Sequence, residues 1–177
     1  INNHLHTDNW FNFQDFYTFV SQQNFKSFVE VGVWKGHSIC FLGNLLKDKE
    51  VSIYAVDLWD LTYKFTDKKN IIPALYDIYL KNLELNNLTN KITNIKKISW
   101  EAANDFEDGS IDFVFIDADH EYDSVVKDIN AWLPKIRKGG MISGHDYFNP
   151  CGVKQAVDEI FGNKVNFHSN KVWYLNI

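Results

Sequence analysis

Short apolar segments alternate with amphipathic segments along most of this chain. The apolar segments are rich in Val, Ile and Phe, which is typical of β-strands. The segment 111–117 is apolar through its centre, as expected of a strand covered on both faces, whereas 95–99 alternates and is expected nearer an edge. The predicted strands are 28–33, 52–57, 95–99, 111–117, 140–144, 165–167 and 172–175.

Between these segments, apolar residues recur every three or four positions, which predicts helices with one buried face. Ser38 is expected to cap the second helix, and the helix over 124–136 is expected to stop at Gly139 and Gly140. The predicted helices are 12–22, 38–46, 71–85, 102–106, 124–136 and 153–161.

This alternation predicts an α/β fold of the Rossmann-like, doubly wound type, with a mostly parallel sheet between two layers of helices. The turn between 165–167 and 172–175 is too short for a crossover, so these two strands must be antiparallel. The 177 residues suit a single domain, 1–177, in which 1–24 forms an N-terminal helical segment.

Composition narrows the class of protein. Aromatic residues make up 16% of the chain, which excludes a disordered protein. The net charge is −5 and Arg137 is the one arginine among 18 basic residues, so nucleic acid is not a favoured partner. No apolar run approaches the roughly 20 residues of a membrane helix, so no membrane partner is expected.

Features of the termini and cysteines suggest a location. Polar residues near the start of the chain interrupt any apolar run of the kind that a secretory signal needs. The first residue is Ile rather than Met, which is expected if the natural N-terminus has been trimmed. Cys40 and Cys151 lack metal-binding spacing, and two thiols in a chain with a full-sized core suggest a reducing compartment. We therefore expect a cytoplasmic protein.

Ligands of parallel sheets bind at the carboxyl ends of the strands, so the residues that follow each predicted strand are the candidates. After the first strand, Gly32 and Gly36 permit a tight turn and close approach of a ligand. Trp34 stands where the dinucleotide motif GxGxxG needs its second glycine. Asp57 ends the second strand, where an acidic residue can accept hydrogen bonds from ribose hydroxyls.

Other aromatic and small polar residues follow the second and third strands. Trp59 is a candidate wall of the site, and Ser99 and Trp100 are placed to bracket a purine. Each of these signals has a structural alternative. The glycine turn need not hold a ligand, Asp57 can simply cap a turn, and Trp59 can pack in the core.

Acidic and imidazole side chains gather after the fourth and fifth strands, more densely than solubility requires. Asp117 and His120 follow the fourth strand, and His145 and Asp146 follow the fifth. Neighbouring parallel strands lie about 5 Å apart, so carboxylates at their ends can converge on one ion. These residues therefore predict a functional site.

Taken together, these blocks resemble the class I S-adenosylmethionine-dependent methyltransferases. The resemblance rests on Glu30-x-Gly32-x-x-x-Gly36, on Asp57 and on the run 115–122, and it spans about residues 25–160. The run 115–122, with 132–134, 138–140 and 145–147, resembles the small O-methyltransferase branch, which includes macrocin-type and catechol-type enzymes. The family implies a seven-stranded sheet with its last strand antiparallel beside the fifth.

The resemblance also implies residue roles. Glu30, Gly32 and Gly36 would shape the loop that binds the methionine part of the cofactor, and Asp57 would hold the ribose. The adenine would lie by Ser99 and Trp100. The remaining expected cofactor contacts are Trp59 and Asp117.

For a metal, the matching positions are Asp117, His145 and Asp146, and oxygen ligands suit Mg²⁺ or Mn²⁺. His145 departs from the carboxylate or amide usual in metal-dependent relatives, so Asp117 and Asp146 are the principal expected ligands. His120 matches a general-base histidine of the sugar-modifying members, and Asp117 is expected to share in catalysis.

The leading functional hypothesis is O-methylation of a sugar, glycan or small hydroxylated metabolite. The alternatives are a nicotinamide-linked oxidoreductase and a nucleoside-binding protein without catalytic activity. The acceptor is expected to contact 2–10, within the N-terminal segment, and 58–70, whose aromatic residues include Tyr63 and Phe65. Apolar surface on these segments would also suit a homodimer interface.

Overall fold

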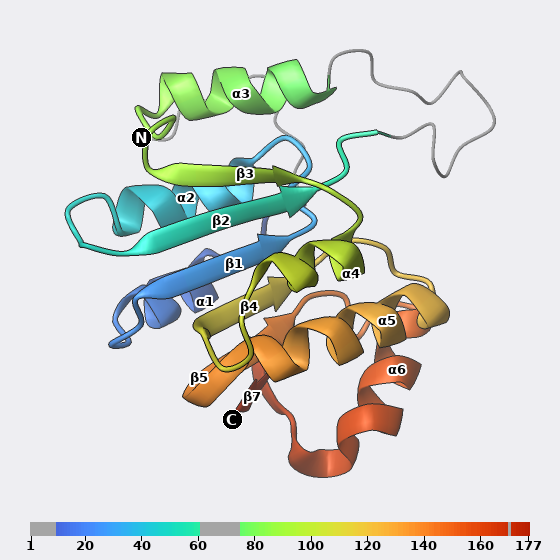
Figure 1. Ribbon diagram of the computed structural model, residues 1–177. Coiled ribbons are helices and arrows are strands. Elements are labelled where there is room, and N and C mark those ends of the chain that lie inside the picture. Colours follow the sequence, from blue (N-terminus) through green and yellow to red (C-terminus); the bar gives the residue numbers. More distant parts are fainter. Residues whose placement is uncertain (1–9, 61–74, 170) are drawn as a thin grey trace.

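A computed structural model describes residues 10–60, 75–169 and 171–177. Its centre is a seven-stranded sheet in the order β3-β2-β1-β4-β5-β7-β6 (Figure 1). The strands are β1 (Ser27–Val31), β2 (Ser52–Asp57), β3 (Ile92–Lys96), β4 (Ile111–Ile116), β5 (Ile136–Gly144), β6 (Asn166–His168) and β7 (Val172–Asn176).

The first five strands are parallel, and β7 runs antiparallel to both β5 and β6. This arrangement confirms the predicted Rossmann-like, doubly wound fold with an antiparallel last strand beside β5. The strand order reverses between β1 and β4, so the carboxyl ends of β1, β4 and β5 lie side by side. Ligands of open α/β sheets bind at such a switch point.

Helices cover both faces of the sheet (Figure 1). The first three helices contribute to one hydrophobic core, and α4, α5 and α6 contribute to the other. The helices are α1 (Gln14–Ser21), α2 (His37–Leu45), α3 (Leu75–Leu85), α4 (Ser99–Ala102), α5 (Tyr122–Trp132) and α6 (Gly152–Phe161), with 3₁₀ turns η3 (Ala103–Asp105), η4 (Leu133–Lys135) and η5 (Gly162–Lys164). No helix in these described ranges is long and apolar enough to cross a membrane.

Strand β4 lies at the centre of the molecule, with all six residues buried. Phe113 and Phe115 enter the core under the first three helices, whereas Val114 and Ile116 enter the opposite one. This alternation explains the continuous apolar run in the sequence, because both faces of the strand are covered.

Three local predictions are wrong. The third strand is Ile92–Lys96 rather than 95–99, because β3 pairs with β2 from Ile92 onward and Ser99 instead opens α4. Helix α5 ends at Trp132, since η4 with its proline follows at once, and β5 runs through Gly139 and Gly140.

The third wrong prediction concerns the start of α2. The N-cap is Gly36, in a left-handed conformation, and no side chain caps the helix. Ser38 donates its hydroxyl hydrogen bond to Glu30 instead. The predicted helix 71–85 agrees with α3 from Leu75 onward, and its first four residues lie outside the described part of the chain.

Candidate functional site

Three side chains converge at the carboxyl ends of β4 and β5. The His120 Nε2 atom lies 3.0 Å from Asp146 Oδ2 and 3.5 Å from Asp117 Oδ1. Each residue offers one ligand atom, and these atoms lie within 4.8 Å of one another. We call Asp117, His120 and Asp146 the acid–imidazole cluster.

The chemistry of this cluster suits a divalent cation, because two carboxylates and an imidazole are common ligands of Mn²⁺ and later transition metals. The members of the cluster differ in solvent exposure. The side chain of Asp146 is 9% exposed and that of His120 is 46% exposed, so the cluster is buried at Asp146 and accessible to solvent at His120. The predicted meeting of Asp117 and Asp146 follows from the pairing of Ile116 with Gly144 in β4 and β5.

His145 lies beside this cluster rather than within the group whose ligand atoms converge. Its Nδ1 atom is 3.2 Å from Asp146 Oδ2 and 4.0 Å from Asp117 Oδ1. Its Nε2 atom is 3.2 Å from Asn12 Oδ1, and its ring packs 5.0 Å from the Phe13 ring. These contacts connect the segment before α1 to the site.

The four titratable groups shift each other's pKa. Burial raises the pKa of Asp117, against the hydrogen bond from His120. Burial also acts to raise the pKa of Asp146, but the hydrogen bond and charge of His145 and the charge of His120 hold it below its ordinary value. The hydrogen bond to Asp117 raises the pKa of His120. Burial opposes ionisation of His145, but Asp146 and Asp117 raise its pKa overall.

The predicted glycine turn lies directly against the acid–imidazole cluster. Gly32 has a φ of 88°, and a Cβ atom there would lie 2.1 Å from the backbone carbonyl oxygen of Asp117. Gly36 has a φ of 84°, and a Cβ atom there would lie 2.7 Å from the ring of Tyr79. Both glycines are therefore required by the backbone turn and by protein packing.

Glu30 lies beneath this turn and is 2% exposed. Its Oε2 atom accepts a hydrogen bond of 2.7 Å from the Tyr17 hydroxyl, and its Oε1 atom accepts one of 2.5 Å from the Ser38 hydroxyl. Burial raises the pKa of Glu30 to about 8, although both hydrogen bonds oppose the shift. The carboxyl group thus links α1, β1 and α2 behind the turn.

Asp57, at the end of β2, holds the turn from the other side. Its Oδ2 atom accepts hydrogen bonds of 2.8 Å from the backbone N–H groups of Val33 and Trp34, and Oδ1 accepts one of 2.7 Å from that of Trp59. Burial raises the pKa of Asp57 against these bonds. Asp57 therefore caps the turn, as the structural alternative predicts. Its carboxylate can still accept a further hydrogen bond, because a carboxylate offers about four acceptor sites.

Trp59 is 5% exposed and stacks on the Tyr79 ring at 4.5 Å between ring centroids. Its Nε1–H donates a 2.9 Å hydrogen bond to the Trp34 carbonyl oxygen. The core-packing alternative thus accounts for its ring and its polar atom.

Ser99 and Trp100 are partly buried at the start of α4. The Ser99 hydroxyl donates to Asp128 Oδ1, and the Trp132 indole N–H donates a 3.2 Å hydrogen bond to the Ser99 carbonyl oxygen. The Lys127 Nζ atom lies 4.9 Å from the centroid of the Trp100 ring.

Sequence reasoning missed three polar partners of these residues. The helical spacing of Tyr17 predicts an apolar position, and its hydroxyl contact with Glu30 has no local signal. Asn12, which contacts His145, has none either. Asp128 is charged yet lies on the same helical face as Val125 and Trp132, and this break in the apolar face was a usable signal.

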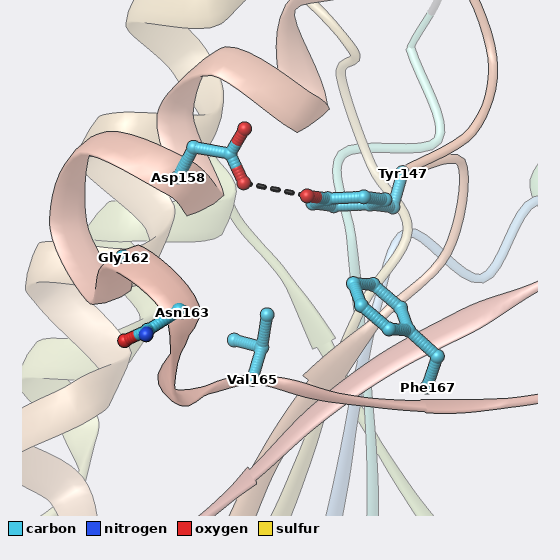
Figure 2. Close-up of a pocket in the computed structure, with 6 residues that line it drawn as sticks. All are labelled: Tyr147, Asp158, Gly162, Asn163, Val165 and Phe167. Carbon is cyan, nitrogen blue, oxygen red and sulfur yellow. Dashed lines mark hydrogen bonds between the residues drawn. The ribbon is translucent and has the colours of Figure 1, made fainter.

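A separate surface hollow of about 430 Å³ lies between α6 and β6 (Figure 2). The Tyr147 hydroxyl donates a 2.6 Å hydrogen bond to Asp158 across its upper side. The lining residues are Tyr147, Asp158, Gly162, Asn163, Val165 and Phe167, so the hollow shares no residue with the acid–imidazole cluster.

Structural comparison places the fold among known enzymes. The O-methyltransferase from Bacillus cereus, solved with SAH, matches with a TM-score of 0.66 at 17% identity, over 93% of this chain and 80% of that one. CalS11, a TDP-rhamnose 3'-O-methyltransferase of calicheamicin biosynthesis, matches with a TM-score of 0.64 at 14% identity, over 92% and 77%. At such identities the likeness concerns the fold.

Sequence comparison identifies the family. Protein R132 of Acanthamoeba polyphaga mimivirus, described as uncharacterized, is 27% identical over an alignment of 127 residues, and the match covers 68% of this chain. It covers 51% of R132, so the chain spans about half the length of this relative. The model of the Methyltransferase domain family matches residues 29–147, well over half of the 177 residues, and confirms the resemblance inferred from the motifs. The chain belongs to the Methyltransferase domain family.

Proposed function

We propose that this protein transfers a methyl group from S-adenosylmethionine to a hydroxyl oxygen. The observation that carries the proposal is the acid–imidazole cluster, which lies at the switch point directly against the Gly32 turn. In a member of a methyltransferase family, this juxtaposition brings the expected donor site and a set of acid–base groups together. Glu30 supports the turn from behind, and we assign Asp57, which holds the turn from the other side, to the ribose.

Methyl transfer from a sulfonium is an in-line displacement. The acceptor oxygen forms a bond to the methyl carbon, the carbon–sulfur bond breaks, and the sulfonium becomes a thioether. The protein must hold the donor and acceptor about 3 Å apart, and it must remove the hydroxyl proton. We assign proton acceptance to His120, whose imidazole is the most exposed member of the cluster.

Asp117 and Asp146 are the residues that would hold a divalent cation. Their carboxylates suit Mg²⁺ or Mn²⁺, and His145 and His120 lie close enough to adjust the site. A bound cation would lower the pKa of an acceptor hydroxyl. His120 directs its Nε2 atom at both carboxylates, so ligation of a cation there would replace the hydrogen bond that this imidazole donates to Asp117. We assign His120 to proton transfer rather than to ligation.

The acceptor class proposed is a sugar or another small hydroxylated metabolite. The fold likeness to CalS11, a TDP-rhamnose 3'-O-methyltransferase, is consistent with this class. Of the segments expected to contact the acceptor, 1–9 and 61–74 lie outside the described residues. The nucleic-acid and membrane classes are disfavoured by the acidic composition and by the apolar pattern of the sequence.

Calorimetric titration with S-adenosylhomocysteine and, separately, with NAD tests the cofactor. Binding of the first and not the second is expected, and the reverse would favour the oxidoreductase alternative. Labelled S-adenosylmethionine is then incubated with a panel of nucleotide sugars and small phenols, with and without Mn²⁺. Label transfer to a hydroxyl supports the proposal, whereas cofactor binding without transfer to any acceptor would favour the non-catalytic alternative.

A further inference from the structure

Helix α5 holds the start of α4 through three side chains. Asp128 accepts the hydroxyl hydrogen bond of Ser99, and Trp132 donates 3.2 Å to the Ser99 carbonyl oxygen. Lys127 places its ammonium 4.9 Å from the centroid of the Trp100 ring. The Ser99–Trp100 pair is therefore fixed both through its backbone and through its side chains.

Asp128 is the unusual member of this set, because it is a fully buried carboxyl group with 0% exposure. Its Oδ1 atom bonds Ser99, and its Oδ2 atom has no hydrogen-bond partner among the described residues. Val125 and Ile129 beside it are also buried. A carboxyl group in such surroundings is costly unless it is hydrogen-bonded, and a small apolar residue would pack there at lower cost.

Burial raises the pKa of Asp128 to about 7, although the Ser99 hydrogen bond opposes the shift. The charge of Asp119, which lies beyond the carboxyl end of β4, adds to the increase. Among the described residues, Ser99 is the one hydrogen-bond partner of the Asp128 side chain. The contact with Ser99 therefore explains best why a costly carboxyl group occupies this buried position.

We propose that Asp128 is a positioning residue for the nucleoside end of the cofactor site. It orients the Ser99 hydroxyl and, through the start of α4, the Trp100 ring, so that the pair presents a fixed polar and aromatic edge to the purine. This inference rests on the proposed function, in which Ser99 and Trp100 flank the adenine. Asp128 itself acts through Ser99 and does not contact the reacting atoms.

A double-mutant cycle with Asp128→Ala and Ser99→Ala tests this coupling. Binding of S-adenosylhomocysteine is measured by calorimetry at pH 8 for the wild type, both single variants and the double variant. Each single change is expected to weaken binding about tenfold, as for loss of one hydrogen bond to a charged group. The double variant is expected to lose no more than either single variant, because Asp128 acts through Ser99.

Conservative variants separate positioning from folding. Asp128→Asn keeps an acceptor oxygen for Ser99 and is expected to restore most of the affinity. Asp128→Leu keeps the branching of the side chain without the acceptor, and it should fold yet bind as weakly as Asp128→Ala. In turnover assays the loss is expected in the KM for S-adenosylmethionine rather than in kcat.

The outcomes distinguish this inference from the proposed function. If the wild type does not bind S-adenosylhomocysteine, the proposed function itself fails. If the wild type binds and Asp128→Leu binds equally well, or if the two single losses multiply in the double variant, the positioning role is overturned while the proposed function stands. A loss that Asp128→Asn does not restore would also overturn it.

Discussion

The backbone carbonyl oxygen of Asp117 lies 2.1 Å from the point that a Cβ atom on Gly32 would occupy. The Asp117 N–H also donates a 2.7 Å hydrogen bond to the Val31 carbonyl oxygen, one residue before the glycine. The expected donor loop and the acid–imidazole cluster are thus packed backbone to backbone. A displacement of one backbone segment would be transmitted to the other, which suits the proposed methyl transfer, because that reaction needs donor and acceptor closely aligned.

This contact makes Gly32→Ala a test of the turn. We expect a large loss in the free energy of unfolding, because the new Cβ meets the backbone of Asp117 and Ala118, which cannot move aside cheaply. Gly109→Ala is the matched control, since Gly109 also has a positive φ, of 68°, but no atom within 4 Å of the added carbon. Its loss is expected to be about 1–2 kcal/mol, the cost of the left-handed backbone alone. Urea denaturation measures both, and equal losses would contradict the packing argument.

Glu30→Gln is expected to change the pH dependence of stability. Burial raises the pKa of Glu30 from its ordinary 4.5 to about 8. Between these values the folded protein keeps a proton that the unfolded chain has released, so this group's contribution falls by about 1.4 kcal/mol per pH unit as pH rises. The variant lacks this term and should gain stability over the wild type from pH 5 to 8.

Urea denaturation at several pH values measures this difference. Glu107→Gln, which removes the same charge from an exposed position, is the control. A constant difference between the wild type and Glu30→Gln across this range would show that Glu30 is already ionised in the folded state.

Variants of the acid–imidazole cluster separate metal binding from proton transfer. Asp117→Asn and Asp146→Asn are each expected to weaken Mn²⁺ binding, measured by electron paramagnetic resonance, by about tenfold or more. His120→Ala should keep most of the Mn²⁺ affinity and lower turnover by roughly 10²–10⁴-fold. Full activity in excess chelator would rule out a catalytic role for a metal. A fully active His120→Ala variant would rule out His120 as the base.

Asp57→Ala is expected to weaken binding of S-adenosylhomocysteine by about tenfold or more while the fold survives, because hydrogen bonds to a charged carboxylate contribute about 1.5–3 kcal/mol each. Asp57 also holds the N–H groups of Val33 and Trp34, so some loss in melting temperature should accompany it. Calorimetry and thermal denaturation measure the two effects. Unchanged affinity in a folded variant would leave Asp57 as a turn residue alone.

Much of the architecture follows from the sequence. The apolar run ending at Ile116 predicts a central strand, and the short turn before Val172 forces an antiparallel pair, because both signals depend on local spacing. The candidate positions Gly32, Asp57 and Asp117 also follow, since the carboxyl ends of parallel strands must share one edge of the sheet. The local pattern places the third strand at 95–99, but pairing with β2 sets its observed boundaries at Ile92–Lys96.

Only the tertiary structure decided which side chains meet. The resemblance makes His145 the candidate imidazole ligand and His120 the candidate base, yet in the structure it is His120 whose nitrogen lies with the two carboxylates. Asp146 has a φ of 61°, in the left-handed region that aspartate adopts more often than most residues, and its local sequence does not specify this conformation. Asp128 and Ser99, which are in contact, lie 29 residues apart in the sequence. Such contacts depend on how the helices pack against the sheet and against each other, and this packing is a property of the whole chain rather than of any segment.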